Sequence, residues 1–247
     1  IGGDNDAEDA SATFSGDLTG AITITENNTT TGDVTVTFNG TTTQTITGNI
    51  DATGAGEGDV VISGSDVNLV GTIGQTQKLG TITVSGTAKF ASTTSIDAAA
   101  LNLTGTLHLG DTMKLGDVAA SQMDVGAGAN AKIVMTSPVA TYDGGVIIDA
   151  ADTASTLDAS NVVDITPHAS FTSGSIIIVN GGSQTTNALT NGDFNVAATS
   201  LATYAVTTSS NVNTITATAK SAAATASEIG ISTQQAEAIG QAAVATS

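Results

Sequence analysis

Short segments in which apolar residues occupy alternate positions recur along the chain from Ala21 to Ala219, separated by Gly, Asn and Asp. Period-two alternation rich in β-branched residues is the signature of a half-buried strand. Each such strand would bury small aliphatic side chains on one face and present Thr, Asn or Ser on the other. The clearest examples lie at residues 21–25, 33–38, 44–47, 80–84 and 101–104.

The strands also repeat on a longer scale, with steps of 21 to 26 residues between equivalent aliphatic positions. This spacing is typical of stacked repeats in which each unit is one coil. It predicts an all-β fold in which residues 21–220 form a parallel β-solenoid. The positions taken as equivalent are Val34, Val60, Ile82, Leu103, Val125 and Ile147.

Composition agrees with a thin aliphatic core. Hydrophobic residues make up 40% of the 247 residues but aromatic residues only 3%, too few for a compact globule built on bulky side chains. In a solenoid, Val, Ile, Leu and Ala suffice because every coil packs on its neighbours. A β-sandwich is the alternative, since turn signals every 8 to 12 residues suit that fold as well.

Several local patterns interrupt or end the repeat. Residues 149–160 are polar and rich in Ala, and predict a loop or protrusion. The apolar run at 175–179 predicts a strand covered on both faces. Residues 201–207 and 213–218 predict a hairpin whose turn is formed by residues 209–211.

The last segment, 221–247, loses the alternation and predicts a helical cap or linker. We expect helices at 222–229 and 233–245, broken at Gly230, with a capping box at residues 232–235. A modest apolar stripe would lie on the second helix, formed by Ala236, Ile239, Ala243 and Val244.

Charge and cysteine content exclude several functions. The chain has five Lys, no Arg and 23 acidic residues, for a net charge of −18, so nucleic acid and anionic lipid would be repelled. The absence of Cys excludes disulfides, thiolate zinc sites and cysteine nucleophiles, and is common in exported proteins. No run of 18 apolar residues occurs, so we expect no direct insertion of this segment in a membrane.

Two stretches of the chain resemble the passenger domains of bacterial autotransporters, particularly the large rickettsial-type outer-membrane surface proteins. Residues 68–84, NLVGTIGQTQKLGTITV, are similar to the coils of those passengers, and residues 201–222 resemble their late hairpin and Ala-rich helix. The resemblance implies a right-handed parallel β-helix, export to the bacterial cell surface or the extracellular space, and a role in adhesion or surface coating.

No pattern of catalytic residues is present, so the sequence predicts that the protein is not an enzyme and holds no organic cofactor. His108 and His168 have no His or Cys neighbour at metal-ligand spacing, and nucleophile and phosphate-binding motifs are absent. The one candidate site is acidic, because closely spaced carboxylates can bind calcium. It comprises Asp4, Asp6, Glu8 and Asp9, within a predicted acidic N-terminal segment at residues 1–20. The alternative is that these carboxylates form a solvated acidic terminus that binds no ion.

These observations predict a non-enzymatic structural or adhesive protein of the cell surface, whose partner is a host or neighbouring cell. The rival hypothesis is a subunit that assembles with copies of itself into an extracellular filament or surface layer, because the end of a solenoid carries unpaired strand edges. A helical cap at the C-terminus favours a monomer. A detachable strand within residues 11–25 would favour assembly by donation of that strand.

Overall fold

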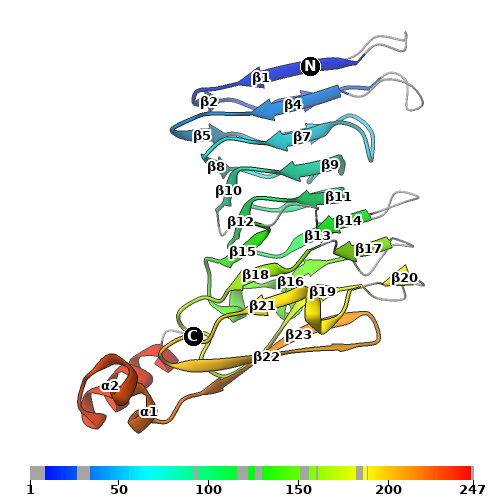
Figure 1. The fold of residues 1–247 in the computed structure, drawn as a ribbon. Coiled ribbons are helices and arrows are strands. Elements are labelled where there is room, and N and C mark those ends of the chain that lie inside the picture. Colours follow the sequence, from blue (N-terminus) through cyan, green and yellow to red (C-terminus); the bar gives the residue numbers. More distant parts are fainter. Residues whose placement is uncertain are drawn as a thin grey trace.

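The computed structural model describes residues 9–26, 34–91, 94–115, 122–125, 130–150, 156–159, 161–181, 186–187 and 189–245. These residues form two large sheets, a third short sheet and two C-terminal helices (Figure 1). The all-β prediction with a short helical C-terminal segment is therefore confirmed.

The largest sheet contains thirteen of the described strands. Its main path runs β1 (Ala10–Phe14), β4 (Val34–Phe38), β7 (Asp59–Ile62), β9 (Leu79–Val84), β11 (Ile96–Leu103), β13 (Met113–Leu115), β16 (Val146–Asp149), β19 (Gly174–Asn180), β23 (Val212–Ala219) and β22 (Ala202–Ser209). A branch from β11 continues through β14 (Gln122–Val125), β17 (Thr156–Ala159) and β20 (Thr186–Asn187).

The second sheet has eight strands, all paired in parallel. Its order is β2 (Leu18–Thr19), β5 (Thr43–Thr47), β8 (Asp66–Val70), β10 (Thr87–Phe90), β12 (Thr106–Leu109), β15 (Lys132–Met135), β18 (Val163–Thr166) and β21 (Phe194–Val196).

The third sheet pairs β3 (Ile22–Ile24) with β6 (Ile50–Ala52) in parallel. Single parallel bridges from Ile50 of β6 to Ile73, and from Ile73 to Ile96, continue this parallel pairing beyond β6. Three short 3₁₀ helices complete the connections: η1 (Val139–Thr141), η2 (Asp143–Gly145) and η3 (Asn191–Asp193).

The register of the largest sheet refines the repeat inferred from the sequence. Val36 lies opposite Val60, Val60 opposite Ile82, and Ile82 opposite Leu101. The positions expected there, Val34 and Leu103, are each displaced by two residues. Since side chains alternate with a period of two, a shift of two keeps the same face inward, and all these residues are buried. The expected step from Val125 to Ile147 is wrong, because Val125 lies opposite Ala159 and β16 pairs with β13.

Inward-facing side chains stack from strand to strand into one aliphatic core. One row runs from Phe38 to Ile62, Val84 and Leu103, each directly opposite the next and each fully buried. Phe14 extends this row at the first strand, where its ring stacks on Phe38 with the centroids 5.9 Å apart. A narrow core of Val, Ile and Leu therefore needs few aromatic residues.

Glycines at the corner between the two large sheets permit the close approach of successive strands. The Gly86 amide donates to Ile62 O at 3.0 Å, and its carbonyl accepts from the Thr106 amide at 2.8 Å. A Cβ atom at Gly86 would lie 2.0 Å from Gly64 O, and one at Gly105 would lie 2.1 Å from Gly86 O. Any larger residue at this corner would push neighbouring strands apart.

The predicted hairpin is present as β22 and β23, joined at Ser210 and Asn211. These two residues have φ of 48° and 66°, as a type I′ turn requires at both central positions. β23 pairs antiparallel with β19 and so covers the last parallel strand of the largest sheet. A register shift between Ile177 and Val179 places Ile178 and Val179 both inward.

The prediction that β19 is covered on both faces is met only in part. Ile176, Ile178 and Val179 are buried, but Ile177 points to the other face and stays half-buried. The continuous apolar run is explained mainly by the local shift in register, which turns two consecutive side chains toward the core.

The two predicted helices are confirmed as α1 (Ala222–Ile229) and α2 (Thr233–Ala245). Gly230 ends α1 in the left-handed region, with φ of 73°. The capping box forms before α2, since the Ser232 amide donates to Gln235 Oε1 at 3.0 Å and the Gln235 amide to Ser232 Oγ at 3.3 Å.

The predicted apolar stripe on α2 packs only at some of its positions. Ala236 is buried and Ala243 half-buried, but Ile239 is 40% exposed, and the Val244 side chain lies outside the description. Thr225 Oγ1 of α1 donates to Ser200 O at 3.0 Å, and Lys220, just after β23, forms an ion pair with Glu228 of α1. The hairpin, rather than the helices, covers the edge of β19.

Two segment boundaries differ from those expected. The sheets begin at Ala10, inside the segment 1–20 predicted to be an acidic terminus, because β1 and β2 pair with β4 and β5. Within residues 149–160, predicted to be a loop or protrusion, Asp149 still belongs to β16, and 156–159 form β17 paired with β14. Its Thr-Leu-Asp-Ala sequence is too short to be recognised as a strand by alternation alone.

The glycine corner leads to a direct test of the strand stacking. We expect Gly86→Ala to lower the free energy of unfolding by about 1–3 kcal/mol, because the added methyl group overpacks the corner. Gly16→Ala is the matched control, since a Cβ there meets nothing within 4 Å. That change should alter stability by about 1 kcal/mol or less. Urea unfolding followed by circular dichroism measures both, and equal effects of the two substitutions would contradict the account.

Candidate functional site

The acidic residues predicted to bind calcium are mostly outside the described part of the chain. Asp4, Asp6 and Glu8 precede the first described residue, and Asp9 is exposed just before β1. Within the residues that the structure does describe, no group of three or more His, Cys, Asp or Glu side chains could hold a metal ion. The calcium site therefore stays a prediction.

A groove of about 530 Å³ runs over the outer face of the eight-stranded sheet. Four polar side chains cross it in a row from consecutive strands: Thr45 of β5, Asn68 of β8, Lys89 of β10 and His108 of β12. Neighbouring strands are about 4.8 Å apart, so the row extends for about 14 Å. All four side chains are half-buried, which limits the conformations that they can adopt.

Further lining residues are Val70 at the end of β8, Ala91 just beyond β10, and Thr136 and Ser137 after β15. Val70 is 44% exposed, one of few large aliphatic residues on the surface. The groove thus combines a polar floor with an apolar edge, an arrangement suited to an extended polar ligand with some apolar surface.

Charges in the groove are balanced by pairing. Lys89 Nζ lies 2.7 Å from Asp66 Oδ1, and the Thr43 hydroxyl donates to Asp66 Oδ2 at 2.9 Å. The hydrogen bond from Lys89, supported by that from Thr43, lowers the pKa of Asp66. Both side chains are partly exposed, Lys89 by 40% and Asp66 by 29%, so the pair orients Lys89 more than it contributes to stability.

The surroundings of His108 favour the neutral form of its imidazole. Burial lowers the pKa of its imidazole, and the nearby positive charges of Lys89 and Lys132 lower it further. A neutral imidazole has one donor and one acceptor nitrogen. The groove therefore offers hydroxyl, amide, ammonium and imidazole groups, which can bind a ligand rich in hydroxyl or carbonyl groups.

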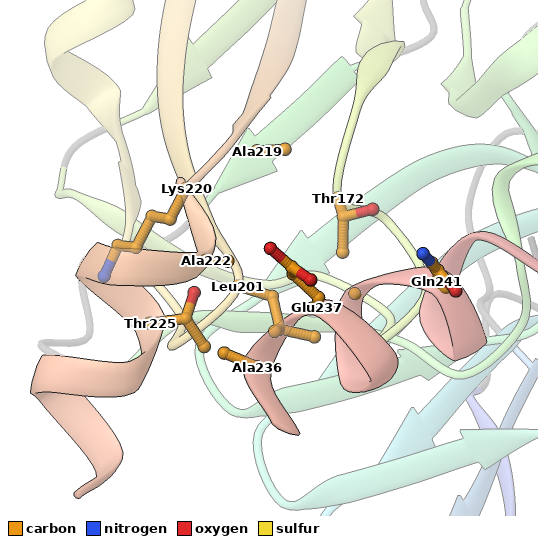
Figure 2. A pocket seen from close by; sticks show the side chains of 10 residues that line it. Thr172, Leu201, Ala219, Lys220, Ala222, Thr225, Ala236, Glu237 and Gln241 are labelled. Atoms are coloured by element: carbon orange, nitrogen blue, oxygen red, sulfur yellow. The ribbon is translucent and has the colours of Figure 1, made fainter. Parts of the chain in front are cut away.

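A second cavity of about 470 Å³ lies between the hairpin and the two helices. Figure 2 shows Leu201, Thr225 and Ala236 meeting in this space, beside Glu237 and Gln241 of α2. Lys220 forms an ion pair with Glu228 at 2.5 Å. Three alanines and Leu201 line the cavity together with polar and charged residues of the helices.

His168 forms a local contact with a potential nucleophile. Its Nδ1 lies 2.8 Å from Ser170 Oγ and also accepts from the Ser170 amide at 3.3 Å. Ser170 is only 4% exposed, and the Phe171 amide closes the same turn on His168 O at 2.9 Å. The contact therefore stabilises a turn and leaves the hydroxyl away from solvent.

Comparison of the chain with protein-family models, curated proteins and solved structures finds no match. The resemblance to autotransporter passengers accordingly stays a prediction. No described helix is both long and apolar enough to cross a membrane.

The sequence singles out His108 but does not reveal the groove around it. His108, Lys89, Asn68 and Thr45 are 19 to 23 residues apart in sequence and meet only because their strands pair in register. The alternation of apolar and polar residues along each strand places all four side chains on the outward face, but it does not show which of them are neighbours. The row becomes visible only once the register is known.

The burial of His108 and the nearby positive charges predict a lowered pKa for its imidazole, which can be measured. In the folded protein the imidazole should titrate below pH 6.5, the ordinary value. The unfolded chain then binds more protons, so stability falls as the pH drops below 6.5. NMR titration of the imidazole proton signals measures this pKa, and the variant His168→Gln assigns the His108 signal, since the chain has two histidines. A midpoint at or above 6.5 would contradict the account.

Proposed function

We propose that this chain is a non-enzymatic structural or adhesive protein of the bacterial cell surface, built as a right-handed parallel β-solenoid. The groove on its eight-stranded sheet is the surface that contacts a host or neighbouring cell. The observation that carries the proposal is the row of Thr45, Asn68, Lys89 and His108, presented by four consecutive strands.

The order of strand pairing supports the solenoid. Successive strands of the chain belong to the largest sheet, then to the second sheet and then to the third. The next strand belongs to the largest sheet again and pairs in parallel with the strand that lies about one repeat earlier in the sequence. This cycle is followed by β1, β2 and β3 and again by β4, β5 and β6. Parallel connections within one sheet are right-handed in nearly all proteins, which supports the right-handed form.

Polar contacts between successive strands support a structural role for the outer faces. The Asn180 side chain donates to Asp149 at 3.0 Å, and the Asn195 side chain donates to Asp164 at 2.7 Å. Both contacts join residues directly opposite each other in parallel strands. Such pairs hold the outward side chains in place, so that a partner meets an ordered surface and loses little side-chain entropy on binding.

Composition supports location outside the cytoplasm. The chain has no Cys and a net charge of −18. Thiols are a liability during export into an oxidising compartment, and a high net charge of one sign favours solubility. These features agree with the export expected from the resemblance to autotransporter passengers.

An adhesion assay tests the proposal. Fluorescent beads coated with the full chain should bind cultured epithelial cells or bacterial cells. The double variant Asn68→Ala/His108→Ala should weaken binding about tenfold, because two hydrogen-bonding groups of the groove are lost. Asn102→Ala is the matched control, since Asn102 is also a half-buried outward Asn but lies on the largest sheet.

Equal adhesion by the double variant and the control would show that the groove is not the contact surface. Absence of adhesion to every cell type would contradict the adhesive role. Turnover of a glycan or peptide that survives repurification and is lost on a single substitution would contradict the non-enzymatic role.

A further inference from the structure

The two end strands of the main path of the largest sheet each have one partner within the described part of the chain. β1 pairs with β4 at one end of the sheet, and β22 pairs with β23 at the other (Figure 1). Each therefore presents a row of backbone groups along its outer edge, a ready template for another strand.

The two end strands run in the same direction. β1, β4, β7, β9, β11, β13, β16 and β19 are linked by parallel pairing. β23 is antiparallel to β19, and β22 is antiparallel to β23. Because two reversals cancel, β22 runs parallel to β1. A second copy displaced along the stack would thus meet β22 with its own β1 in parallel orientation.

Both end strands expose part of the core in the same pattern. In β1, Ala10, Ala12 and Phe14 face inward and are half-buried, whereas the equivalent residues of β4 are buried. In β22, Tyr204 and Val206 are half-buried in the same way, and both pack against the core. Covering these residues with a second copy would complete the core at both ends at once.

Neither end strand carries the features that usually prevent edge pairing. Natural sheets protect exposed edges with charged side chains, Pro, bulges or very short strands. β1 (ASATF) and β22 (ATYAVTTS) contain no charged residue and no Pro, in a chain with 28 charged residues. β22 is also eight residues long and forms an uninterrupted ladder with β23.

We infer that the chain binds a second copy of itself head to tail, with β1 of one copy pairing in parallel with β22 of the next. Ala12 and Phe14 then lie opposite Tyr204 and Val206. Ala202 is buried, and its backbone amide and carbonyl already bond to Thr199, so the contact begins at Thr203. Because the two surfaces differ, the contact is heterologous and repeats into a linear assembly. The inference rests on the pairing of the strands and holds whether or not the groove is adhesive.

Net charge sets the conditions for this contact. Each copy carries a charge of −18, so copies repel one another at low ionic strength. The Debye length is about 8 Å at physiological salt, and screening on this scale removes most of the long-range repulsion. Association should therefore increase with salt, as expected for an uncharged contact between two acidic molecules.

Two variants of the full chain block one end each. Ala12→Glu places a charge on the inward face of β1, and Val206→Glu does the same on β22. In sedimentation velocity at physiological salt, the mass of the wild-type chain should rise with concentration, whereas each variant alone stays monomeric. An equal mixture should form dimers and nothing larger, because each variant keeps the end that the other lacks. Thr83→Glu adds the same charge on the outer face of β9 and should assemble like wild type.

Cysteine pairing provides a second measurement that does not disturb the core. The chain has no native Cys, so a disulfide in Thr13→Cys/Ala205→Cys can join only the introduced residues. Adjacent strands bring Cα atoms within the range that a disulfide allows, and oxidation should give a ladder of linked copies. The control Thr83→Cys/Ala205→Cys should give none.

Circular dichroism and thermal unfolding check that each variant is folded. The inference is overturned if the wild-type chain stays monomeric at all concentrations in physiological salt and the variant Thr13→Cys/Ala205→Cys forms no disulfide ladder. It is also overturned if the wild type assembles but the mixture of the two Glu variants does not form dimers, since assembly then uses another surface. These outcomes do not depend on adhesion to cells.

Discussion

The close approach of successive strands at the sheet corners is the constraint on which the rest of the structure depends. Parallel strands pair at about 4.8 Å, and this spacing must be kept where the chain turns from one sheet to the next. A side chain at Gly86 would overlap the carbonyl oxygen of Gly64, and one at Gly105 would overlap that of Gly86. A second corner depends on Gly48, where φ is 137° and a Cβ would lie 2.3 Å from Gly20 O. Both the narrow core and the ordered outer rows follow from this spacing.

The same constraint explains how residues distant in sequence form one surface. When strands pair in register, every outward side chain lies beside its equivalent in the next strand. Asn68, Lys89 and His108 are neighbours for this reason, and so are Asp164 and Asn195. Within the described residues, the main path of the largest sheet ends at β1 and at β22. The core is only partly covered at these two strands, and both are uncharged.

Alternation and turn chemistry were sufficient to predict the local elements. The strands around 34–38, 43–47 and 79–84, the type I′ hairpin and both helices occur where the sequence places them. These features depend on residues close together in the chain, such as Ser210, Asn211 and Ser232. Local patterns carry this information because each depends on backbone conformation or on contacts within a few residues.

Pairing and the composition of the groove were harder to predict. The register was displaced by two residues at Val34 and Leu103, because a displacement of two leaves every inward residue inward. Alternation therefore cannot distinguish the two registers. The start of the sheets at Ala10 was missed because small residues such as Ala10 and Ala12 give a weak apolar signal. The exposure of Ile239 also follows from tertiary packing, since α2 makes its buried contact through Ala236.

The parallel register of the largest sheet is the central claim, and through-space NMR contacts between strands test it most directly. In a uniformly labelled sample, amide and α-proton cross-peaks should join residues of β7 to those of β9, around the pairs Val61 with Thr83 and Ile62 with Val84. Further cross-peaks should join Thr83 to Asn102. Cross-peaks that instead join β7 to β8 in antiparallel order, as in a sandwich of hairpins, would contradict the account.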